Sequence, residues 1–386
     1  VFEYHGVTSE MAGGVGIVGS MKGTNEVEGF NMTISGTTEL QVPGAPAPVS
    51  MVVGIEQTDR TFDRLPDSAY AEGLLLGFGG AVKGVSGTVS SDEYYLEAAI
   101  PLMEGLTGDV AFRSADYELS GTSNTSRVSL SYVMNDVAKF RVGFNTAERA
   151  PSVANLFIPS SQGLWEGTDN CAGSTPVYTQ AQCANTGLPA SLYGSDLKSP
   201  ADQYNILTGG NPDLVPEESE STTIGIVLTP DAVPGLTLTL DYFDIVVEDK
   251  IGTIPASTSL RQCALTGSAT FCNLLERDPI AGTLWVSPGS IITTNTNVAE
   301  ESMTGFDLIF DYMLETGLGP IDIKGITTFT ETNELTVMPG ETPIECAGFY
   351  GKSCGKNPMP EVAGNYTASL SRGNLNYVCL LYTSPS

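Results

Sequence analysis

The sequence predicts an all-β protein, specifically an antiparallel transmembrane β-barrel with long external loops and short turns at the opposite end. Three observations lead to this prediction. Apolar and polar residues alternate through about a dozen segments, the pattern of strands with one face toward an apolar medium. The connections between these segments alternate between short and long. The chain has 43 Gly and only 16% charged residues, which favours strands and turns over helices.

The charge balance and the hydropathy exclude several other classes of protein. The chain has 17 Lys and Arg against 45 Asp and Glu, a net charge of −28, so most of its surface would repel nucleic acids and anionic lipid headgroups. No stretch approaches the roughly 18 to 20 apolar residues of a membrane helix. The opening residues, VFEYHGVTSE, lack the basic start and apolar segment of a signal peptide, so we expect a mature form or a fragment.

The strand prediction rests on period-two alternation. Val128, Leu130 and Tyr132 alternate with Ser129 and Ser131, and a short connection at residues 134–137 separates them from the next such run, which predicts a hairpin. The same alternation is found at residues 96–100, 110–112, 140–144, 224–228, 236–242, 306–312 and 321–323.

The lengths of the connections predict which end of the barrel each one occupies. Short connections fall near residues 41–48, 103–105, 134–136, 231–235, 315–319 and 371–374. Long or polar ones fall at residues 62–92, 118–125, 150–217, 252–292 and 334–360. Because successive antiparallel strands place alternate connections at opposite ends, all short ones share one end and all long ones the other. This is typical of outer-membrane barrels, with short periplasmic turns and long external loops.

Six cysteines fall into three close pairs, all in the long-loop set: Cys171 with Cys183, Cys263 with Cys272, and Cys346 with Cys354. The spacing predicts disulfides in an oxidising compartment, with free thiols as the alternative. Zinc is disfavoured because the chain has a single histidine. The seventh cysteine, Cys379, lies in residues 379–386, which resemble translated adapter sequence. We therefore expect the native domain to end at residue 378.

The segment around residues 209–251 predicts a strand that returns from the longest loop. About 9 to 11 tilted residues cross the hydrocarbon, yet residues 236–251 stay strand-like and the apolar parity switches after Tyr242, so the second half should project above the membrane. Arg149 leaves one strand at about the height at which Glu217 enters the next. We predict an ion pair that holds the base of the loop; contact with a plug or ligand, or simple solvation, are the alternatives.

Four segments carry a resemblance to a known family. "GGNPDLVPEESESTTIGIVLTP" (209–230), "GLTLTLDYFDIVVEDKI" (235–251), "FRVGFNTAERAPSVANLF" (140–157) and "NVAEESMTGFDLIFDYML" (297–314) resemble the barrel of TonB-dependent outer-membrane receptors. The resemblance covers residues from about 50 to 376, and the first fifty fit only loosely. It implies that residues 1–378 are a partial barrel, about 12 strands of an expected 22 or so. No plug domain and no TonB-contacting segment are recognised in the chain.

The resemblance also implies a function. Such receptors lie in the outer membrane of a Gram-negative bacterium, and a TonB complex acting through a plug domain supplies energy to move a scarce ligand inward. The expected partners are outer-membrane lipid, the TonB complex and a small nutrient such as a ferric siderophore or a carbohydrate. No nucleic acid, cofactor or resident metal is expected. Glu166 and Asp169 offer oxygen atoms to calcium, but no regular ligand spacing supports such a site.

Aromatic residues of the long loops are the candidate ligand contacts, because aromatic faces stack on sugars and siderophore rings. They are Trp165, Tyr178, Tyr193, Tyr204, Trp285, Phe349 and Tyr350. For any one of them, packing within a loop is the alternative role. A catalytic triad is disfavoured by the single histidine, and Asp307 and Asp311 share the lumen-facing parity of their strand, which favours polar lining over catalysis.

The sequence is also compatible with two functions other than a nutrient receptor. One is a passive porin or structural barrel; the other is a secreted acidic β-protein such as a glycoside hydrolase. A barrel with lipid-facing side chains needs detergent for extraction, whereas a secreted protein does not.

Overall fold

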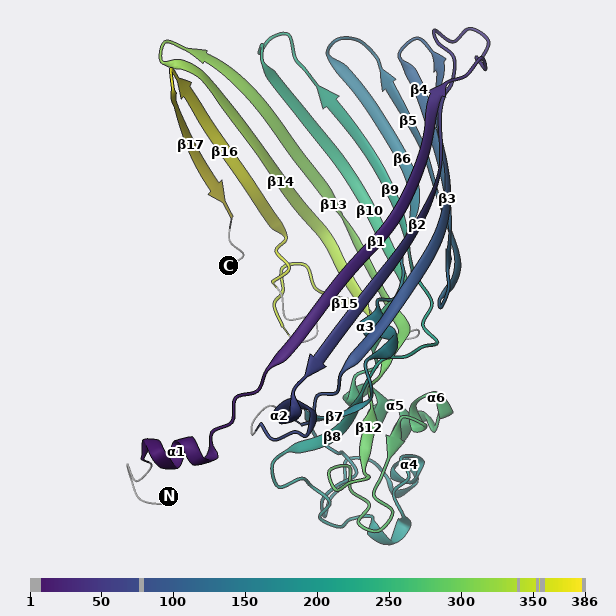
Figure 1. The fold of residues 1–386 in the computed structure, drawn as a ribbon, viewed down its shortest axis with the longest axis vertical. Helices are drawn as coiled ribbons and strands as arrows, with labels where there is room; N and C mark the ends of the chain where they lie inside the picture. The colour runs from purple at the N-terminus through teal and green to yellow at the C-terminus, as the bar shows by residue number, and fades with distance from the viewer. Residues whose placement is uncertain (1–7, 76–79, 339–340, 352–353, 355–357, 384–386) are drawn as a thin grey trace.

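A single curved antiparallel sheet forms most of the molecule (Figure 1). The computed structural model describes residues 8–75, 80–338, 341–351, 354 and 358–383. The strands follow one another around the wall in this order: β1 (Met21–Thr37), β2 (Ser50–Pro66), β3 (Val85–Met103), β4 (Leu106–Tyr117), β5 (Gly121–Val133), β6 (Ala138–Arg149), β9 (Glu217–Leu228), β10 (Leu236–Thr253), β13 (Asn295–Thr316), β14 (Gly319–Thr336), β16 (Val362–Arg372) and β17 (Leu375–Tyr382). This confirms the all-β, antiparallel fold and the expected dozen strands.

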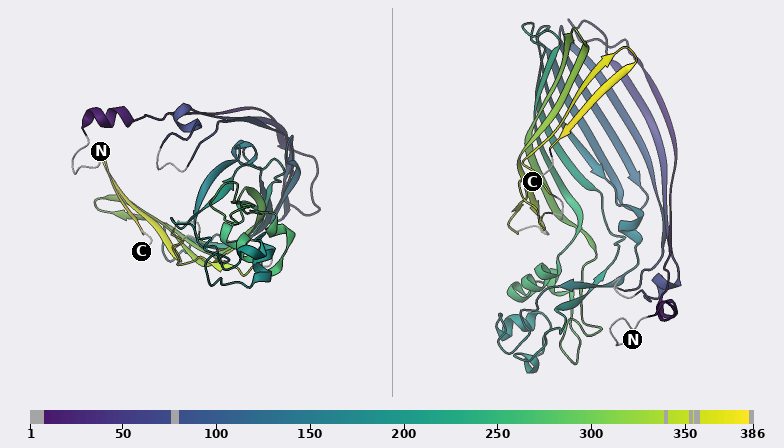
Figure 2. Two further views of the ribbon diagram at one scale, coloured as in Figure 1. Left: turned by 90° about the horizontal axis from the view of Figure 1, so that it is seen from below. Right: turned by 90° about the vertical axis from the view of Figure 1, so that its left-hand side faces the viewer.

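The sheet curves like a barrel but stays open. Within the described residues β1 and β17 form its two edges and do not pair with each other. Figure 2 shows the wall as an arc, with the purple edge strand β1 and the yellow edge strand β17 on either side of the opening. Residues 379–382, which the sequence assigned to a foreign tail, belong to β17, where Cys379 pairs with Ala368 and is exposed. None of the described helices has the length and hydropathy needed to cross a bilayer.

One face of the wall is apolar and exposed. Leu130, Val142, Ile224, Tyr242 and Phe306 pair in sequence across β5, β6, β9, β10 and β13 and form one row. Leu130 and Val142 are each 42% exposed and Ile224 is 54% exposed. A continuous exposed apolar surface of this kind is suited to hydrocarbon rather than water. The outward side chains are therefore those that the alternation assigns to lipid.

The other face is polar and points inward. Ser131, Arg141, Gly225, Asp241 and Asp307 form the neighbouring row across the same five strands. The wall is one layer thick, so its apolar side chains are not enclosed between two stacked sheets. A fold of two stacked sheets, in which a secreted β-protein could enclose its apolar side chains, does not describe this architecture.

The short and long connections lie at opposite ends, as predicted (Figure 1). The long ones span residues 67–84, 150–216, 254–294 and 337–361. Two predicted boundaries were wrong. The β4–β5 connection is only residues 118–120, because β5 already begins at Gly121, and the loop expected at 62–92 is shortened because β2 and β3 pair from Arg64 and Val85 onward. Polar residues continue these strands because the projecting part contacts water rather than lipid.

β10 continues well beyond the length that crosses a bilayer, as expected from residues 236–251. Its pairing with β13 is regular from Leu236 to Val247 and irregular between Val247 and Ile251, where Asp249 has a φ of 50°. The strand is therefore interrupted by a bulge near its outer end, which the sequence did not indicate.

Two long connections fold together into a compact body at the outer end, here called the loop unit (residues 150–216 and 254–294). Its helices are α3 (Val153–Phe157), α4 (Gln180–Asn185), η1 (Ala190–Leu192), α5 (Ala256–Thr266) and α6 (Ala269–Cys272). Its sheet has the order β11 (Leu275–Glu276), β12 (Ser290–Ile292), β8 (Gln203–Thr208) and β7 (Ser161–Glu166). β8 and β12 pair in parallel, which joins one connection to the other.

The remaining elements are short. α1 (Ser9–Val15) precedes β1, α2 (Ser68–Ala71) follows β2, and β15 (Ile344–Glu345) pairs with β14. All three predicted disulfides are present, Cys171–Cys183 and Cys263–Cys272 in the loop unit and Cys346–Cys354 in the 337–361 connection. The prediction of local cysteine pairs is confirmed.

Candidate functional site

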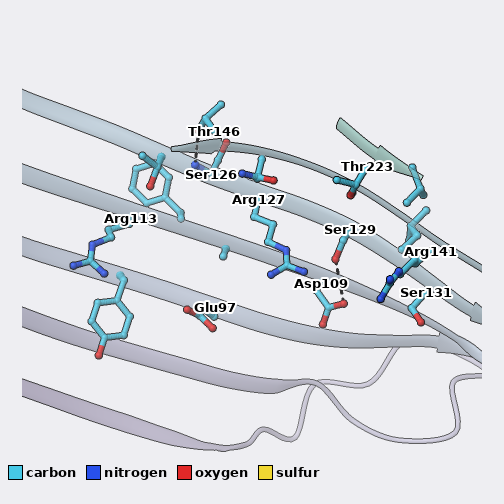
Figure 3. A pocket seen from close by; sticks show the side chains of 18 of the residues that line it. Glu97, Asp109, Arg113, Ser126, Arg127, Ser129, Ser131, Arg141, Thr146 and Thr223 are labelled. Carbon is cyan, nitrogen blue, oxygen red and sulfur yellow. Dashed lines mark hydrogen bonds between the residues drawn. The ribbon is translucent and has the colours of Figure 1, made fainter. Parts of the chain in front are cut away.

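The inner face of the wall carries a charged hollow of about 800 Å³ that extends over β2 to β9. Figure 3 shows Arg127 and Arg141 on the same stretch of wall as Glu97 and Asp109. Period-two alternation places these side chains on one face because each lies an even number of residues from its inward neighbours. The hollow is thus a surface of mixed charge rather than an apolar pocket.

Ion pairs link neighbouring strands inside this hollow. Arg113 on β4 binds Glu93 on β3 through Nε and reaches Glu56 on β2 with Nη2 at 3.1 Å. Its guanidinium lies 5.8 Å from the centroid of the Tyr95 ring, within the range of a cation–π contact. The Tyr95 hydroxyl in turn hydrogen-bonds Thr33 on β1 at 2.6 Å. The network therefore fixes four successive strands from the inside.

A second pair crosses a strand between its partners. Arg141 on β6 binds Asp241 on β10, with Nε 2.9 Å from Oδ1, although β9 lies between them. The position on β9 is Gly225, which pairs with both residues. A Cβ at Gly225 would lie 1.8 Å from Asp241 Oδ1 and 2.9 Å from Arg141 Nε. The missing side chain is what allows the two charges to meet.

At the outer end of the wall, Arg149 and Glu217 form the predicted contact. Arg149 Nε and Nη2 donate to the two carboxylate oxygens of Glu217 at 2.6 and 2.5 Å, and the backbone N–H of Ile251 donates to Oε1 at 2.7 Å. Glu217 is 6% exposed. The carboxylate thus joins β6, β9 and β10 at the point where the chain leaves for the loop unit and returns.

α3 folds back into the mouth of the wall just beyond Arg149. Ser152 caps the helix through a reciprocal hydrogen-bond pair with Asn155. The buried Val153 and Leu156 pack against Val85 and Val89 on β3, and Leu214 completes the cluster. Val85 and Val89 share the parity of Glu93 and Glu97, so the loop unit attaches to the inner face of the wall.

A buried ion pair holds the two connections of the loop unit together. Arg277 Nη1 donates to Asp169 Oδ2 at 2.7 Å and Nη2 to Oδ1 at 3.1 Å, and both side chains are at most 2% exposed. Arg277 also donates to the carbonyl oxygens of Thr186 and Gly282. Both oxygens of Asp169 accept from this guanidinium, so the carboxylate that the sequence offered to calcium is used within the fold.

A second cavity, of about 450 Å³, lies where the loop unit meets the strands below it. Its apolar lining comes from both connections: Ile158, Trp165 and Ile206 from one, Pro255 and Ala256 from the other. Asn295, at the start of β13, also lines it. The sequence did not indicate this cavity, because its two halves are far apart along the chain. We call it the Trp165 cavity.

The 337–361 connection contacts the loop unit through Glu341. Arg261 Nη2 lies 3.0 and 3.1 Å from the two carboxylate oxygens, and the Gln262 amide donates to Oε1. The hydrogen bond from Gln262, followed by that from Arg261, holds the pKa of Glu341 below its usual value. Glu341 is therefore ionised at neutral pH and links α5 to the 337–361 connection.

Comparisons with known proteins agree with this geometry. The sequence family described as "TonB dependent receptor-like, beta-barrel" matches residues 13–377. The chain belongs to the TonB-dependent receptor β-barrel family. The match begins well before residue 50, so the first fifty residues fit the family better than the sequence suggested. No curated protein matches by sequence.

Solved structures of TonB-dependent receptors share the fold at low sequence identity. A mutant ferric enterobactin receptor from Pseudomonas aeruginosa is 14% identical with a TM-score of 0.55, over 93% of this chain and 41% of that one. The siderophore receptor PirA from Acinetobacter baumannii is 16% identical with a TM-score of 0.52, over 92% of this chain and 42% of that one. The chain thus spans less than half the length of these receptors. The family and its structural neighbours are transport receptors rather than enzymes, and they are outer-membrane proteins.

Within this receptor barrel, the loop unit contains five of the seven aromatic residues named as ligand contacts. Trp165 lines the cavity, and its ring centroid lies 5.7 Å from that of Tyr204. Tyr204 is 1% exposed in the core of the unit, and Trp285 packs on that core while Nε1 donates to the carbonyl oxygen of Leu197 at 3.1 Å. Tyr178 and Tyr193 pack beside the Cys171–Cys183 disulfide. The contacts of these four residues fit loop packing, the alternative role.

The other two aromatic residues lie on the 337–361 connection of the receptor. Phe349 is 61% exposed and Tyr350 is 73% exposed. Trp165 packs on the same core as Trp285 but also lines the cavity, and Phe349 and Tyr350 are exposed, so these three are the residues best placed to touch a ligand.

Proposed function

We propose that this receptor lies in the outer membrane of a Gram-negative bacterium and takes up a scarce nutrient, such as a ferric siderophore or a carbohydrate, with energy supplied by a TonB complex. The observation that carries the proposal is the loop unit. A folded body with its own core and two disulfides stands over the external end of a lipid-facing wall, where a ligand would arrive. Membership of the TonB-dependent receptor family also supports the proposal.

Ligand capture is assigned to the outer end and passage to the inner face. Trp165, Phe349 and Tyr350 would meet the ligand first, and the charged hollow would border its path. Ferric siderophores are the favoured cargo because the structural neighbours include receptors for ferric enterobactin and other siderophores. The TonB complex would act through a plug domain.

Uptake by cells tests the proposal. A strain that lacks the gene encoding this chain should lose the saturable import of ⁵⁵Fe-siderophore or labelled oligosaccharide shown by its parent. An uncoupler that collapses the proton-motive force should abolish the import in the parent. Import that persists with the uncoupler and grows linearly with concentration would instead support a passive porin.

A further inference from the structure

The Trp165 cavity differs in charge from its surroundings. The described residues that line it include no Lys, Arg, Asp or Glu; the polar side-chain groups among them belong to Thr residues, Asn295 and the indole N–H of Trp165. The Asn295 amide nitrogen already donates to the carbonyl oxygen of Asn155 at 3.1 Å, so its Oδ1 is the available acceptor. A volume of about 450 Å³ falls in the range typical of small-molecule sites.

Two of the three cations of the loop unit are neutralised by carboxylates. Arg277 is buried against Asp169, and Arg261 binds Glu341. Lys198 is the cation of the loop unit for which the described residues provide no ion pair. An anionic ligand would therefore meet Lys198 in the loop unit and Lys83 beside β7, in a hollow that Lys83 shares with residues 160–164, but no converging group of paired donors in the cavity lining.

The strand ends below the loop unit add negative charge. Glu148, Glu218 and Glu248 are directly opposite one another on β6, β9 and β10, at the height where the chain enters the unit, and Glu218 and Glu248 share the parity of the outward Ile224 and Tyr242, so these two lie on the outer side of the rim. The loop unit itself carries the acidic residues Glu166, Asp169, Asp196, Asp202, Asp213, Glu276 and Asp278 against the basic residues Lys198, Arg261 and Arg277. This field raises the free energy of any anion that approaches the mouth.

We propose that the Trp165 cavity binds an uncharged small molecule through an apolar face, and that the acidic surroundings exclude anionic chelates. This rests on the proposed function, since it names the ligand class of that receptor. Trp165, Ile206, Pro255 and Ala256 supply apolar contact, and Asn295 Oδ1 accepts a hydrogen bond from a ligand hydroxyl or amide. The shared chemistry fits both an uncharged iron chelate and a sugar.

Equilibrium dialysis of the full chain refolded in detergent tests the proposal. The probes are ferrichrome and maltotriose, both uncharged, and ferric enterobactin, a trianion. We expect one uncharged probe to bind more tightly than ferric enterobactin, and to lose affinity about tenfold in Trp165→Ala. Leu164→Ala is the control, because Leu164 is the neighbouring residue, is 50% exposed and does not line this cavity. Binding of ferrichrome would identify the ligand as an uncharged iron chelate, and binding of maltotriose would identify it as a sugar.

Two further measurements keep the test informative if Trp165→Ala folds poorly. In Trp285→Phe, Trp165 is the sole tryptophan, so the bound uncharged probe should change its fluorescence. Raising the salt from about 0.05 to 0.5 M should leave binding of the uncharged probe unchanged and strengthen that of ferric enterobactin, because screening weakens repulsion.

The inference would be overturned if ferric enterobactin bound at least as tightly as both uncharged probes. It would also be overturned if the affinity for ferric enterobactin fell as the salt concentration rose. Energy-dependent uptake of ferric enterobactin by cells would then still uphold the proposed function. Loss of energy-dependent uptake for every probe would remove the proposed function itself.

Discussion

Arg149 and Glu217 lie directly opposite each other on β6 and β9, and the guanidinium donates to both oxygens of the carboxylate. The pair closes the base of the 150–216 connection, because one residue ends the strand before it and the other begins the strand after it. Glu217 is buried while the Arg149 side chain is 58% exposed. The two partners should therefore respond differently to mutation.

Arg149→Met should lower the free energy of unfolding by about 1–2 kcal/mol, because it leaves a buried carboxylate with the Ile251 N–H as its remaining donor. Arg149→Met combined with Glu217→Gln should be less destabilised than the sum of the two single variants. Urea titration of the protein folded into lipid vesicles measures all four members of this cycle. Strict additivity would mean that the contact contributes no coupling.

Gly225→Ala should break the Arg141–Asp241 ion pair, because the new Cβ would occupy the space of Asp241 Oδ1. We expect a loss of about 1 kcal/mol and a smaller dependence of stability on salt. Gly143→Ala is a matched control, since its Cβ would meet Thr223 Oγ1 at 3.3 Å and Ser129 Cβ at 3.5 Å, close to ordinary contact. Equal effects of the two alanines would show that the ion pair is not what Gly225 serves.

Asp169→Asn should loosen the loop unit without unfolding the wall, since it leaves the buried Arg277 without a charged partner. We expect a loss of about 3–5 kcal/mol within the unit, and a smaller one when Asp169→Leu is combined with Arg277→Leu. Hydrogen–deuterium exchange should rise at residues 161–208 and 275–292 but not in β4 to β6. Asp196→Asn, at an exposed position, should change nothing.

Val142→Lys tests which face meets lipid. Val142 belongs to the outward row, so a charge there should cost about 2–4 kcal/mol in a bilayer. Thr223→Lys, on the inward face beside the charged hollow, should fold with nearly unchanged yield in the same vesicles. The opposite ranking would reverse the assignment of the two faces.

Acid should release the 337–361 connection from α5. Because hydrogen bonds hold the pKa of Glu341 below the usual 4.5, the contact stabilises the folded state above that pH and is lost as the pH falls through the lowered pKa. The backbone N–H of Glu341 donates to the carbonyl oxygen of Met338. The methyl resonance of Met338 should therefore shift as the pH falls through the lowered pKa of Glu341. In Glu341→Gln this step should be missing.

Local patterns predicted the wall but not the body that covers it. Strand positions, the two faces and the alternation of connection lengths all follow from side chains that repeat every second residue. The disulfides could be predicted from the sequence because each joins cysteines 8 to 12 residues apart. Arg149 and Glu217 were placed together because strand heights can be counted along the sequence.

The contacts between connections could not be read in the same way. Asp169 and Arg277 are separated by 108 residues, and β8 pairs with β12 through Ile206 and Ile291, which are also far apart along the chain. No periodicity links such segments, so the buried ion pair and the Trp165 cavity depend on tertiary packing alone. A weak signal was present in Arg277 itself, a cation in a connection that contains few of them.

The three disulfides have a further consequence for survival outside the cell. Each closes a small covalent ring within an external connection, Cys171–Cys183, Cys263–Cys272 or Cys346–Cys354. A protease that cut once inside a ring would leave both new ends attached, and the paired strands of β8 and β12 would keep the halves of the loop unit together. Secreted proteases of competing organisms could thus nick the receptor at these points without detaching any part of its outer surface.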